Sequence, residues 1–329
     1  MLSKRENAIL AYEGEKTEYV PCFFDSCQII PGGSSLEFPE AGKPGYDGYG
    51  VHQTPTESTG GMFTPTPTVT PVLNSDNITD WKSIVKFPDY KNLPHEEIAK
   101  ALSSEMHLDP DNYVQDMFVA NGIFERLHFL MGFEEAMMAL MTEPEAVYEL
   151  VGAIADKKIE YMEYAAKYFK PDYFTYLDDY AFGGGLLMDK DTFRSIFKPH
   201  LARIVEAAGK NGLKFKQHCC GKMQDLLDDF LDIGITRFDP VQPVNDIPAM
   251  RKRAGKNICI MGGLDVQNVI DRDDVTDEQI EKEVRRCCEC YGKDGGYIIY
   301  GASLRMYNPA EYMPGGVLYK VNRAAEKYA

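Results

Sequence analysis

A distorted (β/α)8 barrel is the fold class that this sequence predicts, and three observations lead to it. Short apolar runs alternate with amphipathic helical stretches, the helical stretches are long enough to link parallel strands, and no Gly-x-Gly-x-x-Gly motif follows an early strand. Alternating strands and helices form parallel βαβ units. The missing glycine motif disfavours the alternative, a doubly wound open sheet.

Seven strands can be read from the apolar runs. They are expected at residues 18–26, 113–121, 171–179, 213–220, 236–241, 257–265 and 296–303. Helices are expected between most of them, at residues 134–168, 190–210, 222–233, 246–254 and 276–292. An eighth strand is not evident, and the long first loop is the place where it could lie.

The whole chain, 1–329, is expected to form one barrel domain, in which residues 1–90 supply an N-terminal extension, the first strand and a lid-like loop. The loop is rich in Gly, Pro and Thr, yet it also contains Tyr46, Tyr49 and Phe63. Such aromatic content argues against disorder, and a loop of this length in a compact domain is usually functional when it is ordered. We therefore predict an insertion that folds over the site, with Tyr46 and Phe63 against the substrate.

Composition excludes several classes of protein. The formal net charge is −16 and no basic stripe is present, so nucleic acid is not an expected partner. No run of eighteen apolar residues occurs, so no membrane span is expected. The first residues lack the apolar segment of a signal peptide, so we expect a cytoplasmic protein whose eight cysteines are reduced.

Polar or reactive side chains follow the ends of the predicted strands. They are Asp25, Asn121, Asp178, Asp179, the run His218-Cys219-Cys220, Gln242 and Asp265. Barrel enzymes have their active sites at the carboxyl ends of the strands. These residues are therefore expected to meet in one pocket.

The strand that ends in His218-Cys219-Cys220-Gly221 is the most informative one. Side chains alternate across a strand, so His218 and Cys220 should point into the barrel mouth while Cys219 points the other way. Imidazole and thiolate are preferred ligands of Zn²⁺, and Asp178 or Asp179 on the preceding strand could add an oxygen. Cys259 is a less favourable ligand, because it precedes Gly263 by four residues and so lies ~13 Å below the strand end. The alternative is a hydrogen-bonded histidine beside a small buried thiol.

Three segments resemble the uroporphyrinogen decarboxylase superfamily. They are residues 178–221, which end in LKFKQHCCG, residues 235–267, which contain FDPVQPV and CIMGGLD, and residues 295–313, which begin with GGYIIYGAS. The resemblance covers roughly residues 75–329. It implies a distorted (β/α)8 barrel whose site lies at the carboxyl ends of the strands.

The resemblance is closer to the corrinoid-dependent methyltransferase branch than to the decarboxylases. Decarboxylases of the superfamily have an Arg-rich N-terminal motif, which is absent from residues 15–35. The methyltransferases hold zinc with an H-x-C pair, matched here by His218 and Cys220, and with a later cysteine, where this chain has Ala302 or Ser303. The O-demethylating members imply another ligand set, which here would be Asp191, Cys219 and Cys259.

The expected activity is a zinc-dependent transfer of a methyl group from a small methoxylated aromatic molecule to a corrinoid carrier protein. Zinc would be held on this chain and the corrinoid on the partner; the sequence leaves homo-oligomers open. The expected roles can be stated residue by residue: catalytic His218, Asp178 and Asp179; substrate-binding Asp25, Asn121, Gln242, Asp265, Tyr46 and Phe63; metal-binding His218, Cys220, Cys219 and Cys259.

Two other functions fit the same fold. A metal-free decarboxylase or lyase would use the carboxylates Asp25, Asp178, Asp179 and Asp265 in acid–base catalysis. A non-catalytic binding protein could keep the fold without the chemistry, and the missing later cysteine is the feature that favours it.

Overall fold

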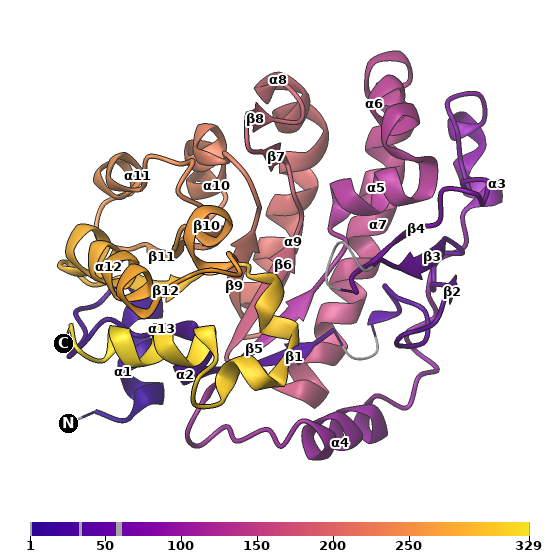
Figure 1. Cartoon of the computed structure of the whole chain (residues 1–329). Coiled ribbons are helices and arrows are strands. Elements are labelled where there is room, and N and C mark those ends of the chain that lie inside the picture. The colour runs from indigo at the N-terminus through magenta and orange to yellow at the C-terminus, as the bar shows by residue number, and fades with distance from the viewer. Residues whose placement is uncertain (1, 33–34, 57–60, 329) are drawn as a thin grey trace.

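Seven parallel strands form the central sheet of the computed structural model, which describes residues 2–32, 35–56 and 61–328. The strand order is β1-β5-β6-β9-β10-β11-β12 (Figure 1). The strands span Cys27–Pro31 (β1), Val114–Val119 (β5), Tyr173–Leu177 (β6), Lys214–His218 (β9), Arg237–Val241 (β10), Cys259–Gly263 (β11) and Tyr297–Tyr300 (β12). Helices link these strands, as in a distorted (β/α)8-type barrel, and the predicted fold class is confirmed.

Most linking helices agree with the sequence pattern. Those that follow β5 to β12 are α5 (Ile123–Met131), α6 (Phe133–Thr142), α7 (Pro144–Tyr164), α8 (Lys190–Thr192), α9 (Lys198–Lys210), α10 (Leu227–Asp232), α11 (Ile247–Ala254), α12 (Asp277–Cys287) and α13 (Val317–Ala325). The predicted helix at 134–168 is in fact α6 and α7 followed by a π-helical turn, with a break at Glu143–Pro144. Proline is favoured at the first turn of a helix, so a new helix begins there.

The first predicted strand, 18–26, is wrong. Residues Phe23–Ser26 form a helical turn, α2, and the strand begins only at Cys27. The Ser26 hydroxyl donates to the Cys22 carbonyl (2.7 Å) and closes the turn, which is how short polar side chains compete with a strand ladder. Before the turn, Cys22 forms a single parallel bridge with Ile299 of β12. This short segment joins the two edges of the sheet where an eighth strand would lie.

The described residues of the long first loop, which leave out 33–34 and 57–60, do not supply that eighth strand. It contains a separate antiparallel sheet of β2 (Gly45–Tyr46), β3 (His52–Pro55) and β4 (Phe63–Pro65), followed by α3 (Trp81–Ile84) and α4 (His95–Glu105). Figure 1 shows this small sheet beside α3, on the side of the molecule away from β10–β12. Residues 57–60 of the loop lie outside the described part of the chain.

A buried ionic cluster fixes this loop to the barrel. Arg126 of α5 is fully buried, and it binds Asp47 (2.6 Å) and Glu37. Lys158 of α7 also binds Glu37, and the Arg126 guanidinium lies 4.2 Å from the centre of the Tyr49 ring. Buried charges persist when they are paired. The described parts of the loop are thus ordered and anchored through α5 and α7.

Two buried clusters pack on the two faces of the sheet strands. The larger one lies between the sheet and its helices and includes Ile154, Leu201 and Ile260. The smaller one contains the alternate strand positions, such as Cys259 and Met261, together with Tyr12 of α1 (Lys4–Tyr12). The Tyr12 and Tyr173 rings stack with centres 3.9 Å apart. Helix α1 therefore covers the end of the barrel that is opposite the strand carboxyl ends.

No helix in the described ranges is long and apolar enough to cross a membrane.

Candidate functional site

The end of β9 brings the predicted zinc-binding pair together. The Cys220 Sγ lies 3.5 Å from the His218 Nε2, and the donor atoms of Asp179, His218 and Cys220 all lie within 4.8 Å of one another. His218 is buried, whereas Asp179 and Cys220 are partly exposed. We call these three residues the donor triad. Nitrogen, sulfur and carboxylate oxygen are all zinc ligands.

Backbone geometry places Cys220 beside Asp179. The Cys220 N–H donates to Asp179 Oδ1 (2.6 Å). The other carboxylate oxygen, Oδ2, does not accept this hydrogen bond. Gly221 then turns the chain with φ +81°, and a side chain there would lie 2.6 Å from the backbone of Phe182. Only glycine fits this position easily. The turn is held further by Gln242, whose Oε1 accepts the Gly221 N–H (2.6 Å).

Asp239 of β10 lies behind His218. Its Oδ1 is 3.6 Å from the His218 Nδ1, and the two residues are paired in register across β9 and β10. Burial opposes the imidazolium form of His218, but Asp239 outweighs it and raises the histidine pKa. A carboxylate at Nδ1 orients a histidine ring and leaves Nε2 for a metal ion. Here Nε2 is the atom that faces Cys220.

A buried lysine holds Asp239 in turn. The Lys216 Nζ lies 3.3 Å from Asp239 Oδ2 and 2.5 Å from Asp116 Oδ2. The Tyr12 hydroxyl donates to the same Asp116 oxygen (3.0 Å). All of these side chains are nearly or fully buried. The network runs from α1 through the barrel interior to His218. It places two carboxyl groups and the Lys216 ammonium group behind the donor triad.

The carboxylate Asp178 has a different role from its neighbour. It accepts the N–H groups of Phe124 (3.2 Å) and Glu125 (3.0 Å) and the Tyr180 hydroxyl (2.5 Å). It therefore caps the N-terminus of α5, and a side chain at Gly122 would collide with it. Burial raises the pKa of Asp178 to about 6. These bonds point to a structural role in place of the predicted catalytic one.

Glu125 is a further acidic group beside the triad, and the strand-end pattern missed it. Burial, followed by the charges of Asp179 and Asp178, raises the pKa of Glu125 well above its ordinary value. It lies at the start of α5 and not at a strand end, so alternation along strands could not reveal it. The carboxyl groups of Glu125, Asp178 and Asp179 thus lie close together at the carboxyl ends of the strands, near the thiols of Cys219 and Cys220.

The two other proposed thiol ligands lie outside the triad. The Cys219 Sγ accepts the Tyr180 N–H (3.3 Å) and packs in the larger core cluster, on the opposite face of β9 from Cys220. Cys259 is buried near the start of β11, in the small cluster with Tyr12 and Tyr173. Asp191 is almost fully exposed on α8. The structure does not bring these three residues together with His218.

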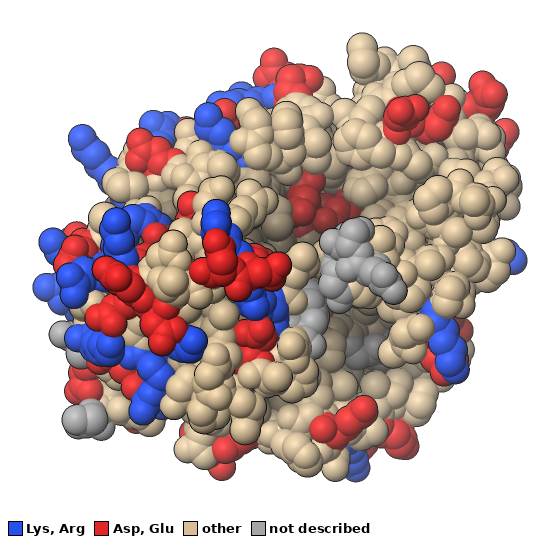
Figure 2. All heavy atoms as spheres, in the orientation of Figure 1, with Lys and Arg blue, Asp and Glu red and all other residues tan. Residues whose placement is uncertain are grey.

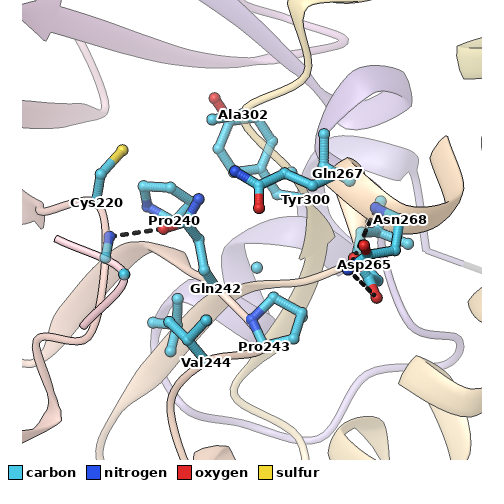
Figure 3. Close-up of a pocket in the computed structure, with 18 of the residues that line it drawn as sticks. Cys220, Pro240, Gln242, Pro243, Val244, Asp265, Gln267, Asn268, Tyr300 and Ala302 are labelled. Carbon is cyan, nitrogen blue, oxygen red and sulfur yellow. Dashed lines mark hydrogen bonds between the residues drawn. The ribbon is translucent and has the colours of Figure 1, made fainter. Parts of the chain in front are cut away.

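A cavity of about 490 Å³ adjoins Cys220 at the carboxyl ends of β9 to β12. Figure 3 shows it, with Cys220 on one side and Asp265 with Asn268 on the other. Gln242 and Asp265 line the cavity as predicted from their strand-end positions, and Tyr300 and Ala302 complete the wall by β12. The Ser303 hydroxyl instead donates to Asp271 (2.5 Å). The superfamily pattern has a later cysteine at this place. This chain instead has Ala302, whose side chain is a methyl group, and Ser303, whose hydroxyl is already bound to Asp271.

Four residues predicted to bind substrate lie elsewhere. Asp25 forms an ion pair with Lys4 (2.6 Å), because the α2 turn precedes the strand and keeps Asp25 from its end. Asn121 donates to the Glu37 carbonyl (3.2 Å) and so binds the early loop. Tyr46 is 66% exposed, Phe63 packs against Phe38, and neither is among the described residues that line the cavity.

The donor set fits a zinc ion. Burial raises the pKa of Cys220 well above its ordinary value, with Asp179 adding to the effect, so the thiol is neutral until a cation compensates its charge. Metal binding to cysteine releases such a proton.

Replacing Asp239 with asparagine tests the support that it gives to His218. We expect zinc affinity to fall about 10- to 100-fold, because the ring loses the carboxylate at Nδ1. Competition with a chromophoric chelator would measure it. Asp229→Asn is the matched control, since Asp229 is a buried carboxylate paired with Arg194 and Lys198 away from the site. Equal affinities in wild type and Asp239→Asn would rule out this role.

Comparison with known proteins assigns the family. The sequence pattern of the family described as Uroporphyrinogen decarboxylase (URO-D) matches residues 55–302, whereas a search of curated proteins found no match. Among solved structures, a methyltransferase from Methanosarcina mazei superposes with a TM-score of 0.64 at 14% identity, over 100% of this chain and 99% of that one.

Two other solved structures superpose less well. A D-psicose 3-epimerase from Clostridium cellulolyticum H10 has a TM-score of 0.39 at 10% identity, over 71% of this chain and 83% of that one. A xylose isomerase domain protein from Planctomyces limnophilus has a TM-score of 0.42 at 10% identity, over 73% and 87%. The family pattern, by contrast, spans most of the barrel and both residues of the H-x-C pair, so the chain belongs to the uroporphyrinogen decarboxylase (URO-D) family.

Proposed function

We propose that this protein is a zinc-dependent methyltransferase that moves a methyl group from a small methoxylated aromatic molecule to a corrinoid carrier protein. The observation that carries the proposal is the donor triad beside the cavity: a histidine, a cysteine and an aspartate with their donor atoms within 4.8 Å. Membership in the URO-D family and a fold shared with a methyltransferase from Methanosarcina mazei support the same reaction class.

His218, Cys220 and Asp179 would hold the zinc ion. When bound, zinc supplies Lewis acidity to an ether oxygen. Asp239 and Lys216 keep the His218 ring in place, and the bonds to Gly221 and Cys220 keep the thiol beside it. The triad thus has a rigid frame, which a site of this kind needs in order to position its substrate.

The cavity would hold the aromatic ring of the methyl donor next to Cys220. Its wall combines apolar groups such as Pro240 and Tyr300 with the carboxamides of Gln242 and Gln267, a mixture typical of small-molecule sites. In the proposed reaction the bond between the methyl carbon and the ether oxygen breaks. The methyl group passes to the reduced corrinoid of the partner, and the oxygen keeps the electron pair and takes up a proton.

A decarboxylase is the second candidate from the sequence, and the cavity disfavours it. No Lys or Arg occurs among the described residues that line the cavity. A substrate with several carboxylates needs cationic partners when it is desolvated. The metal-donor atoms of the triad lie beside the cavity. We regard this arrangement as better support for an enzyme than for a non-catalytic binding protein.

The test is an assay with the zinc-loaded protein, methoxylated aromatics and a carrier protein with its corrinoid reduced. We expect the spectrum of the reduced corrinoid to disappear only when all three components are present. His218→Ala should lose at least about 100-fold in rate, whereas Cys219→Ala should retain most of it. Methyl transfer without the corrinoid, or release of carbon dioxide from a carboxylated substrate, would contradict the proposal.

A further inference from the structure

The cavity beside Cys220 has a wall that is neutral or acidic. Its ionisable side chains, among the described residues, are Asp265, Cys220 and Tyr300, and none of them is basic. Asp265 accepts both the backbone N–H (3.1 Å) and the side-chain amide (3.0 Å) of Asn268. Those bonds place a carboxylate at the wall opposite Cys220, where Figure 3 shows it.

More acidic groups lie behind the near wall. Asp179 accepts the Cys220 N–H, and Asp178 and Glu125 are adjacent to Asp179. In Figure 2 this face of the molecule is hollowed at its centre, and acidic side chains are visible inside the hollow. No Lys or Arg offsets these groups among the described residues that line the cavity.

The positively charged side chains near the cavity either are paired or do not line it. Lys216 binds Asp116 and Asp239 inside the barrel. Arg286 donates to the carbonyl of Gly263 (2.7 Å), but its guanidinium is bound by Glu283 (2.6 Å). Lys222 follows Gly221 in the chain, yet it is not among the residues that line the cavity. In the proposed site the charge of the zinc ion would be balanced by Cys220 and Asp179, and the ion would bind the ether oxygen. A ring carboxylate would therefore enter the rest of this space without a cationic partner.

The hydrogen-bonding groups that do face the cavity are amides. The Gln242 oxygen is occupied by the Gly221 N–H, so the amide nitrogen is what this side chain can offer. In Figure 3 the carboxamide of Gln267 reaches into the middle of the cavity. Amides bind neutral hydroxyl and ether oxygens well, and a buried carboxylate poorly when no cation assists.

We propose that the methyl donor is an uncharged methoxyarene, and that this site rejects methoxyarenes with a ring carboxylate. This inference rests on the proposed methyl transfer and adds the charge of the substrate. An unpaired ring carboxylate in the cavity would lose part of its hydration and face the Asp265 carboxylate. A selectivity of about 100-fold for the uncharged compound follows.

A matched pair of compounds tests this directly. 1,2-Dimethoxybenzene and 3,4-dimethoxybenzoate share their two methoxy groups and differ in one carboxylate. Calorimetric titration of the protein without corrinoid would give binding, and the assay with a reduced carrier would give kcat/KM. We expect the neutral compound to be favoured about 100-fold in both measurements.

Placing a cation in the cavity wall should shift the substrate preference toward the benzoate. Gln267→Lys puts an ammonium group where the carboxamide reaches into the cavity, and it should raise binding and turnover of the benzoate by at least about tenfold. Gln267→Met is the matched control, since it has similar length and no charge, and it should leave the benzoate poorly bound. A benefit from the methionine variant equal to that from lysine would overturn the charge argument.

The outcomes separate this inference from the proposed function. Demethylation of the benzoate as fast as that of dimethoxybenzene would overturn the inference and leave the methyltransferase standing. Failure of every methoxylated compound to lose its methyl group would overturn both. Selective binding and turnover of the neutral compound would support both.

Discussion

Removing His218 and Cys220 together is expected to lower zinc affinity by more than about 100-fold. The two residues supply the nitrogen and sulfur of the donor triad, and their atoms lie 3.5 Å apart. Asp179 alone would remain, and part of its carboxylate already accepts the Cys220 N–H. One oxygen ligand does not make a tetrahedral zinc site.

Metal analysis after dialysis against a weak chelator would measure this effect. Wild type should retain close to one zinc per chain, and the His218→Ala/Cys220→Ala variant should retain almost none. Cys219→Ala is the matched control, because Cys219 is the adjacent thiol and faces the core beside Tyr180. Thermal unfolding of all three proteins without metal would show that each is folded. A double variant that keeps its zinc would refute the assignment of the triad.

Lys216→Met should produce the largest loss of stability, about 3–5 kcal/mol in the free energy of unfolding. The lysine is buried between Asp116 and Asp239, which are both fully buried themselves. Methionine matches the length of the side chain but supplies no charge. Two carboxylates would then lie in the barrel interior without a cation.

The loss should depend on pH in a defined direction. Burial already raises the pKa of Asp116 in the folded protein, and removal of Lys216 should raise it further. Because the folded variant then binds this proton more tightly than the unfolded chain, the loss relative to wild type should be smallest at low pH and should grow as the pH rises through the pKa of Asp116. Urea unfolding at several pH values would measure this dependence.

Two further variants serve as controls for Lys216→Met. Lys214→Met lies on the same strand, but Lys214 is 45% exposed and pairs with Glu13 near the surface, so it should cost less than about 1 kcal/mol. Adding Asp116→Asn to Lys216→Met should restore part of the stability. A loss for Lys216→Met no greater than that for Lys214→Met would show that the network does not need its cation.

The central part of the fold could be predicted from the sequence, because each inner strand is a compact apolar run. Six of the seven expected strands, from residue 113 onward, lie where the pattern indicated. The first strand was misplaced because Cys22 to Ser26 closes a local turn through the Ser26 hydroxyl. The Ser26 hydroxyl acts there with the backbone N–H groups of Asp25 and Ser26, which donate to the same carbonyl, and periodicity does not record these local bonds.

The donor triad could also be predicted, because alternation along one strand decides which side chains share a face. His218 and Cys220 face the same side, and Cys219 faces the core, as expected. Asp179 was one of two adjacent candidates. Asp178 caps α5, whereas Asp179 accepts the Cys220 N–H, and this difference separates them. That cap joins residues 53 positions apart in the chain.

The support behind His218 was missed, although the sequence contains a signal for it. Asp116, Lys216 and Asp239 are charged residues in the middle of otherwise apolar runs, which is unusual for strands buried on both faces. Charges at such positions must pair with one another. Which of them pair depends on the register of strands that are far apart in sequence, and no local pattern gives that register.

The fate of an isotopically labelled methyl group is the most direct test of the proposed methyl transfer to the corrinoid carrier. A methoxyarene with ¹³C in its O-methyl group would be incubated with the zinc-loaded protein and a carrier whose corrinoid is reduced, and the carbon would be followed by NMR. We expect the label to move to the corrinoid of the carrier while the phenol appears in equal amount, and we expect neither with His218→Ala/Cys220→Ala. A label that stays on the arene, or that leaves it without reaching the corrinoid, would rule out the proposed methyl transfer.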